Sequence, residues 1–464
     1  MKTTDKNEQS NLGMKGVYRM EVKFPRSITR MLVVLALLTA GEARADFTIG
    51  SIDLLQYKLQ RKTAFVTSKG SSDACPGIFV VLKAADPDGR NLTAVGEILP
   101  RGLVTNETQA DAWRGAQVFR EKLLGKTLPG KSLADDTAAI RGWMKDLFAV
   151  AAEQKLETKT PPLAHRQLRS TLCGYDMALL DLVGQIHGVS IAKVLGEARK
   201  EVTISATTYG ADIEEADLEN KIDDTNAAYK AVRLKIGLDD ESDISKLHTV
   251  AQAMVAEGKG REIWVDVNQA WKTAEKSIAM LGRIRDMLKE TGFKAHFICE
   301  QPTYELDIPA LAAVTKEVRQ WGDSPKMVIM ADEAMWDKRD AEEIVKLEAA
   351  DAVNIKIVKA GGLLGSLEIG QYLAEHAPNM QVYVGGLIMT DISAAANLQL
   401  CLALPRLDYA SGPLPRTTSY PVNPATVPLK YVSGRTLAEP AAPGLGTGLD
   451  VTAVQPFVSK TFPK

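Results

Sequence analysis

The sequence lacks the cysteine, histidine and glycine patterns that mark several common functional sites. Its four cysteines are far apart and show no CxxC or other zinc spacing. None of its five histidines forms an HxH pair, which argues against a barrel hydrolase that binds its metal through histidine. No GxGxxG segment is present, so a doubly wound dinucleotide-binding sheet is disfavoured. We expect the cysteines to be single core or loop residues, with Cys75 the most exposed.

An excess of charge of either sign is also missing. The 464 residues include 56 Lys and Arg against 58 Asp and Glu, so nucleic acid is not an expected partner. Hydrophobic residues make up 45% and charged residues 25%, which are ordinary values for a soluble globular protein. The length suits one large or two ordinary domains.

One apolar run stands out near the N-terminus, and it is too short to cross a bilayer. Residues 31–40 follow a basic stretch and precede Ala43-Arg-Ala45, which is the layout of a secretory signal. We therefore expect a signal peptide over residues 1–45, cleavage between Ala45 and Asp46, an exported periplasmic protein, and no stable membrane anchor. A disordered or interfacial tail is the alternative, and the start could be Met1 or Met20.

Residues 46–190 are predicted to form an α+β domain. The first part alternates as in an antiparallel sheet, and residues 107–187 show helical spacing in about three pieces. The polar stretch Gln60–Ala74 is longer than a hairpin needs, so we predict a loop that acts as a lid. The expected strands are Ile49–Leu59, Gly77–Leu82 and Leu92–Ile98.

Residues 191–412 are predicted to form a barrel of parallel strands. Short β-rich runs alternate there with longer amphipathic segments, and eight such units fit a closed barrel. The Pro- and Gly-rich residues 413–464 show little helical periodicity, so we expect them to return to an earlier element. The eight expected strands are Ile204–Tyr209, Ala231–Lys235, Ile263–Val267, Phe297–Glu300, Val328–Ala331, Ala352–Ile357, Gln381–Val384 and Arg406–Tyr409.

Three consecutive strands of this barrel end in a carboxylate. Asp266, Glu300 and Asp332 end the third, fourth and fifth runs, so they should converge at the mouth of the barrel. Three carboxylates so close repel one another unless a cation lies between them. An all-oxygen ligand set suits Mg²⁺, or Mn²⁺, better than zinc. The alternative is that these residues are helix caps or salt-bridged structural acids.

Two lysines flank this acidic group. Lys235 ends the second strand and Lys356 the sixth, so in a ring of eight they lie on opposite sides of the mouth. Two amines so placed can remove a proton from one face of a substrate and return it on the other. The cation would stabilise the enediolate that proton loss creates. The alternative is that each lysine is a solvated or ion-paired charge.

From about residue 46 to residue 455, the sequence resembles the enolase superfamily. Within it, the resemblance is to the mandelate racemase/muconate-lactonizing-enzyme group, specifically to its muconate-lactonizing-enzyme subgroup. The motifs that carry the resemblance are Arg233-Leu-Lys235, Asp266-Val-Asn268, Glu300-Gln-Pro302, Asp332-Glu333 and Asn354–Gly362. The superfamily is known for a Lys or His base with Mg²⁺ on an enediolate. The resemblance implies a modified TIM barrel, (β/α)7β, with an N-terminal α+β capping domain that the C-terminal segment completes. It also implies a homo-oligomer that acts on a small-molecule carboxylate with no cofactor besides the metal.

The resemblance further assigns residues. Lys235 and Lys356 would be catalytic, and Asp266, Glu300 and Asp332 would bind the metal. The residues expected to bind substrate or support these groups are Arg233, Asn268, Glu333 and Asp408. Two departures bear on the substrate: Met389 stands where the family often has Glu, and Asp408-Tyr-Ala410 keeps only the first Asp of a D-x-D pair. The second departure weakens a dipeptide substrate.

The reaction we expect is racemisation or epimerisation of an N-acyl amino acid or dipeptide-like substrate. Cycloisomerisation or syn-elimination of water, as in muconate cycloisomerase or o-succinylbenzoate synthase, uses the same site with one lysine as base and stays open. Two further alternatives are a Schiff-base aldolase or lyase with Lys356 as nucleophile, and a carboxylate-binding protein without turnover.

Overall fold

The computed structural model describes residues 46–157, 163–205, 208–218, 230–322, 324–412 and 419–463. The predicted signal peptide, residues 1–45, lies outside these residues, so its prediction is untested. Within the described ranges, no helix is both long enough and apolar enough to cross a membrane.

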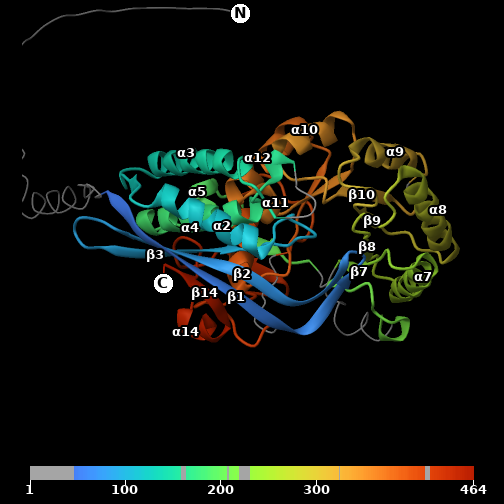
Figure 1. Cartoon of the computed structure of the whole chain (residues 1–464). Coiled ribbons are helices and arrows are strands. Elements are labelled where there is room, and N and C mark those ends of the chain that lie inside the picture. Colours follow the sequence, from blue (N-terminus) through green and yellow to red (C-terminus); the bar gives the residue numbers. More distant parts are fainter. Residues whose placement is uncertain are drawn as a thin grey trace, which may run out of the picture. The chain divides into compact units, whose positions relative to one another are not determined.

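An antiparallel sheet begins the described chain (Figure 1). Its order is β14-β1-β2-β3, and the short β4 pairs with β1. Buried and exposed side chains alternate along much of β1, as expected for a strand with one face on a core. The strands are β1 (Phe47–Thr67), β2 (Gly70–Ala85), β3 (Asn91–Ile98), β4 (Thr127–Leu128) and β14 (Val458–Phe462).

The predicted loop conformation at Gln60–Ala74 is wrong, because β1 and β2 continue through it as an antiparallel ladder with an irregularity between Gln60 and Phe65. Phe65 pairs with Ser72 and Thr67 with Gly70. The β-branched and aromatic residues of this stretch suit a strand, although their polar neighbours suggested a loop. We call residues 60–75 the cap hairpin. Cys75 lies in this ladder and is buried, so the prediction that it is exposed is also wrong.

Helices cover one face of this sheet (Figure 1): α2 and α4 contact its strands, and α3 packs on these two helices. The side chains of Thr108 and Ser132 accept backbone N–H groups at the starts of α2 and α3, which is why the helices begin there. Helix α4 is buried along almost its whole length and packs on β3. The helical elements of this part are α2 (Gln109–Leu123), α3 (Leu133–Ala152), η1 (Ala164–Arg166), α4 (Arg169–His187) and α5 (Ile191–Leu195).

A parallel sheet of seven strands follows, in the order β12-β11-β10-β9-β8-β7-β6. Its strands are β6 (Thr208–Tyr209), β7 (Ala231–Lys235), β8 (Glu262–Asp266), β9 (Phe297–Glu300), β10 (Met327–Ala331), β11 (Ala352–Ile355) and β12 (Gln381–Val384). The helices that alternate with them are α7 (Asp240–Glu257), α8 (Ala274–Glu290), α9 (Ile308–Arg319), α10 (Lys338–Lys346), α11 (Ile357–Ala360), α12 (Leu363–His376) and α13 (Asp391–Ala403).

The eighth predicted strand, Arg406–Tyr409, is irregular instead. The backbone N–H groups of Asp408 and Tyr409 both point to one carbonyl, that of Val382 in β12. Two successive donors on one acceptor cannot continue a ladder. Ser411 then forms an isolated bridge with Ile204, which precedes β6 in the chain, so this segment contacts both β12 and the residues before β6.

The end of the chain returns to earlier elements. Strand β13 (Thr436–Ala438) pairs with β5 (Glu201–Thr203), and β14 pairs with β1. The short α14 (Val451–Val454) and η2 (Gln455–Phe457) precede β14. The C-terminal segment thus adds an edge strand to the antiparallel sheet, whereas the predicted domain limits stay predictions.

Candidate active site

The three predicted metal ligands meet at one edge of the parallel sheet. Asp266 ends β8, Glu300 ends β9, and Asp332 directly follows β10. The ladder places Asp266 directly beside Glu300, because parallel strands keep their carboxyl ends at one edge. One carboxylate oxygen from each residue lies within 4.8 Å of the others, and all three side chains are buried. We call these residues the carboxylate triad.

Burial and mutual repulsion shape the charge of the triad. Burial, followed by the neighbouring Asp266 and Asp332, raises the pKa of Glu300 to about 8. Burial also disfavours the charge on Asp332, but Lys356 and Lys359 outweigh it and hold the pKa of that carboxyl well below its usual range. The triad therefore needs positive charge close by.

Lysines supply that charge in this structure. The ammonium group of Lys235 contacts Asp266, and that of Lys356 contacts Asp332. Burial alone would lower the pKa of Lys356, but Asp332 and Glu300 reverse the effect and raise it. Lys235 ends β7 and Lys356 directly follows β11, and the three strands between them carry the triad. Both line one cavity of about 390 Å³.

Arg233 lies in the same cavity beside two aromatic rings that pack against each other. Its guanidinium carbon is 4.2 Å from the ring centre of Trp264 and 5.0 Å from that of Tyr383. It donates hydrogen bonds to the Tyr383 hydroxyl at 2.6 Å and to Glu300 at 3.2 Å. Asn354 donates to the other oxygen of Glu300 at 2.6 Å. These contacts hold the Glu300 carboxylate in place.

The residues that follow β8 and β9 have strained backbone conformations. Asn268, Gln269 and Gln301 all have positive φ angles, of 47°, 68° and 39°, and such conformations in residues other than glycine collect at functional sites. The backbone N–H of Asn268 donates to Asp266 at 2.9 Å, and its side-chain amide donates to Glu333 at 3.1 Å.

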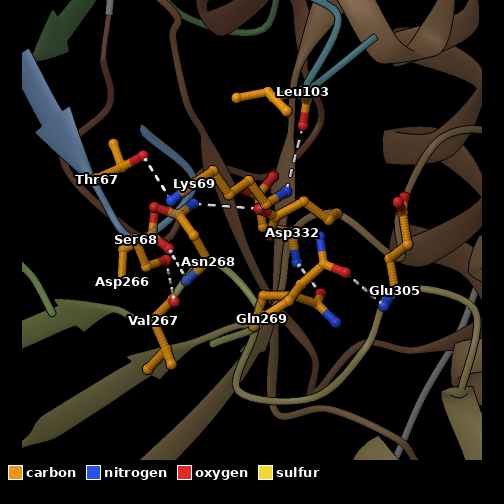
Figure 2. A network of polar contacts seen from close by, with 12 residues as sticks. Thr67, Ser68, Lys69, Leu103, Asp266, Val267, Asn268, Gln269, Glu305 and Asp332 are labelled. Atoms are coloured by element: carbon orange, nitrogen blue, oxygen red, sulfur yellow. Dashed lines mark hydrogen bonds and ion pairs between the residues drawn. The ribbon is translucent and has the colours of Figure 1, made fainter. Parts of the chain in front are cut away.

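The cap hairpin reaches this site with its tip (Figure 2). The Ser68 hydroxyl donates to the Val267 carbonyl at 3.0 Å, one residue after Asp266. The Lys69 ammonium lies 2.8 Å from Glu333 and 3.4 Å from the Leu103 carbonyl, to which it donates. Burial and Asp332 disfavour the charge of Glu333, but Lys69 and Lys356 outweigh them, so its pKa is lowered.

Sequence reasoning missed two of these lysines. Lys69 was hidden in the stretch predicted as a loop. Glu333 was a predicted site residue, but no local pattern indicates that it pairs with Lys69. Lys359 is fully buried and contacts both the carbonyl and the carboxylate of Asp332. Burial lowers the pKa of Lys359. Its spacing of three after Lys356 in a helical segment is a signal that could have found it.

Asp408 is the predicted site residue that the structure places elsewhere. Its carboxylate accepts the Val382 N–H at 2.8 Å and pairs with Arg406 at 3.2 Å. It does not line the cavity, because Val382 lies in the first half of β12 rather than at its carboxyl end. A direct contact of Asp408 with substrate is therefore not supported.

The triad suits a divalent cation. Its donors are all carboxylate oxygens, they are close together, and they need a counter-charge, which fits Mg²⁺ or Mn²⁺. The Asn268 side-chain oxygen and one oxygen of Glu333 are buried without a hydrogen-bond partner among the described residues. The residues present thus fit the predicted metal, although they do not choose between the two ions.

Comparison with known proteins places the chain in a family. A family model described as Enolase C-terminal domain-like matches residues 217–453, which is more than half of the chain. The chain therefore belongs to the enolase superfamily through this family. The relatives that match at modest identity are epimerases, racemases and cycloisomerases, which are all isomerases.

Three individual matches illustrate the similarity. L-Ala-D/L-Glu epimerase of Clostridium acetobutylicum is 28% identical over 234 residues, which span 50% of this chain and 60% of that enzyme. The structure of N-succinyl Arg/Lys racemase from Bacillus cereus has a TM-score of 0.71 at 20% identity, covering 89% of this chain and 99% of that one. A dipeptide epimerase from Enterococcus faecalis, complexed with Mg and L-Leu-L-Tyr, has a TM-score of 0.69 at 22% identity, covering 86% and 99%. The predicted superfamily, fold class and enzyme class are confirmed.

Proposed function

We propose that this protein is a Mg²⁺- or Mn²⁺-dependent enzyme that removes the proton α to a substrate carboxylate and returns a proton to the same carbon. The observation that carries the proposal is the placement of Lys235 and Lys356. They enter one cavity from β7 and β11, and the three strands between them end in the triad. Racemisation or epimerisation is the reaction that uses both lysines.

Each residue has a role in this chemistry. Asp266, Glu300 and Asp332 would hold the cation, which supplies positive charge beside the substrate carboxylate when the α-proton leaves. One lysine, in its neutral form, accepts the α-proton, and the C–H electron pair moves into the carboxylate to form an enediolate. The other lysine, as an ammonium group, donates a proton to the opposite face, and the electron pair returns to the α-carbon.

The lysines in this structure are the counter-charges of the triad. If a metal ion replaced a lysine as the counter-charge of the triad, the pKa of that lysine would be lowered, because a nearby cation favours the neutral amine. That is the state that a base needs near neutral pH. Arg233 and Asn268 would keep Glu300 and Asp266 in position through the contacts described above.

The substrate is proposed to be an N-acyl amino acid or a dipeptide-like molecule. The names of the solved relatives, an N-succinyl Arg/Lys racemase and a dipeptide epimerase, support this class. Cycloisomerisation is the second candidate, because a chloromuconate cycloisomerase is 30% identical over 292 residues. In that case one lysine removes the proton and the other stabilises charge.

The proposal is tested by α-proton exchange in deuterated water. The Mg²⁺-loaded protein is incubated with pooled N-acyl amino acids and dipeptides, and loss of the α-proton signal is followed by NMR. We expect exchange with Mg²⁺ and none in EDTA. Lys235→Ala and Lys356→Ala should each lower the rate by about 10²- to 10⁴-fold, whereas Lys346→Ala, an exposed lysine on α10, should not. Exchange in no pool would overturn the proposal. Full activity in EDTA with borohydride trapping on Lys356 would favour the Schiff-base alternative.

We also propose, from the sequence, export with removal of residues 1–45 and assembly into a homo-oligomer. N-terminal sequencing of the protein recovered from the periplasm should begin at Asp46. Light scattering of that protein would give its oligomeric state. A periplasm free of the protein, or a monomer, would contradict the respective proposal.

A further inference from the structure

The cavity is lined by more positive than negative side chains. Its acidic lining residues are Asp266, Glu300 and Glu333, and the cationic ones are Arg61, Lys69, Arg101, Arg233, Lys235 and Lys356. Four of the six cations are balanced by an acid. Lys69 pairs with Glu333, Arg233 with Glu300, Lys235 with Asp266, and Lys356 with Asp332, which lies just outside the lining.

The two remaining cations, Arg61 and Arg101, come from the part of the cavity that the antiparallel sheet provides. Among the described residues, their contacts are neutral. Arg61 donates to the Thr63 carbonyl at 3.0 Å and lies 5.8 Å from the ring centre of Phe65. Arg101 donates to backbone carbonyls, those of Pro76, Pro100 and Ile388, at 2.7 to 2.8 Å and to a sulfur.

An uncompensated guanidinium that is partly removed from water is costly. The Nε atom of Arg101 is buried and has no hydrogen-bond partner in the described part of the chain. Arg61 is half-buried on β1, and Phe65 and Thr67 of the same strand line the cavity with it, as does Lys69 in the turn that follows. An anionic group that enters the cavity would supply the negative counter-charge that neither arginine has among the described residues.

Because of these ion pairs, the described lining of the cavity has no unpaired carboxylate that could bind a positively charged substrate group. The charge of a buried amino terminus is balanced best by a carboxylate, and each acidic residue of the described lining already has a cationic partner. Asp408, the acid expected to bind such a group, contacts Val382 and Arg406 instead. A divalent cation on the triad would add further positive charge.

We propose that the substrate carries a second carboxylate besides the one at the reacting carbon, and no ammonium group. An N-acylated amino acid with an acidic acyl chain has this charge pattern, whereas a dipeptide with a free amino terminus does not. Arg61 is the residue that selects the second carboxylate, and Arg101 adds to the field. This inference rests on the proposed function and names the substrate class of the same site.

The test compares three N-substituents on the same pool of neutral L-amino acids. N-succinyl derivatives carry the second carboxylate, N-butanoyl derivatives replace it by a methyl group, and N-alanyl derivatives present an ammonium group. The rate of α-deuterium uptake by the Mg²⁺-loaded full chain gives kcat/KM for each. We expect the succinyl derivatives to exceed the butanoyl ones at least tenfold, and the alanyl ones to be slowest.

Variants assign the preference to a residue. Arg61→Gln should shrink the succinyl-to-butanoyl ratio towards one, and Arg61→Lys should retain part of it. Lys62→Gln is the matched control, because Lys62 is exposed, is next in the chain and does not line the cavity. Its ratio should equal that of the wild type.

The outcomes separate this inference from the proposed function. If butanoyl or alanyl derivatives exchange as fast as succinyl ones, or if Arg61→Gln leaves the ratio unchanged, the inference is overturned and the proposed function stands. If no derivative exchanges, the proposed function falls. Calorimetric binding of N-succinyl-L-leucine and N-butanoyl-L-leucine then decides the charge preference: equal affinities overturn it, and tighter binding of the succinyl compound supports it.

Discussion

Replacing Lys69 by Met should loosen the cap hairpin over the cavity. The hairpin tip is held to the parallel sheet by the Lys69–Glu333 ion pair at 2.8 Å and by the Ser68 hydroxyl on Val267. The Lys69 side chain is 21% exposed and that of Glu333 is 5% exposed. Solvent therefore screens this pair only in part, unlike a fully exposed pair.

The expected magnitude follows from this geometry. A hydrogen bond to a charged group contributes about 1.5–3 kcal/mol when it is shielded, and we take the lower end because Lys69 is partly exposed. About 1.4 kcal/mol corresponds to a tenfold change in an equilibrium constant. The hairpin should therefore separate from the sheet about ten times more often in Lys69→Met.

Hydrogen exchange at one amide measures this separation. The Ala211 N–H donates to the Val66 carbonyl of the hairpin at 3.0 Å, and Ala211 is otherwise buried. Its exchange should be about tenfold faster in Lys69→Met than in the wild type. Lys62→Met, which replaces an exposed lysine of the same hairpin, should leave it unchanged. A change below twofold in Lys69→Met would refute the idea that this ion pair holds the hairpin.

Three further predictions concern packing, pH and metal. Gly96→Ala should destabilise the protein by about 3 kcal/mol, because its Cβ would lie 1.9 Å from the Gly174 carbonyl oxygen. Gly142→Ala, with nothing within 4 Å, should instead gain about 0.5–1 kcal/mol; equal urea midpoints for the two variants would contradict this reasoning. Burial raises the pKa of Asp176 from 3.8 to about 7, and its carboxylate accepts the backbone N–H of Leu363 at the start of α12. The stabilisation that the protonated carboxyl provides is complete below pH 3.8 and is lost as the pH rises through 7. Relative to Asp176→Asn, the wild type should thus lose up to about 4 kcal/mol of unfolding free energy over that window; parallel stability curves would exclude this role. EDTA should abolish exchange but leave the far-UV circular dichroism spectrum intact, because lysines neutralise the triad in this structure; Mg²⁺ or Mn²⁺ should restore activity, and unfolding in EDTA would show that the cation is structural.

Local patterns in the sequence predicted much of the parallel sheet. A buried strand is a short apolar run, and the polar residue that ends the run marks the edge of the sheet. Asp266, Glu300 and Lys235 could therefore be placed from the sequence alone, since each is the last residue of its strand. Asp332 and Lys356 directly follow theirs.

The same reasoning failed where pairing, rather than composition, decides the conformation. The cap hairpin carries polar residues, yet its two arms are partners in a ladder. Arg406–Tyr409 alternates polar and apolar residues as a half-buried strand does, but two of its N–H groups share the Val382 carbonyl. A strand requires a partner in register, and the residues of a single run do not reveal whether such a partner is present.

The sequence by itself determined the kind of chemistry, because the triad and the two flanking lysines come from strand ends that repeat in order along the chain. Only the tertiary structure decided how the charges combine. Lys69 and Glu333 are separated by more than 260 residues, and so are Arg101 and the Ile388 carbonyl. Which cations are balanced, and which are left for a substrate, depends on how the antiparallel sheet packs over the barrel. Charge pairing acts across space at distances of a few ångströms, so no local pattern in the sequence records it.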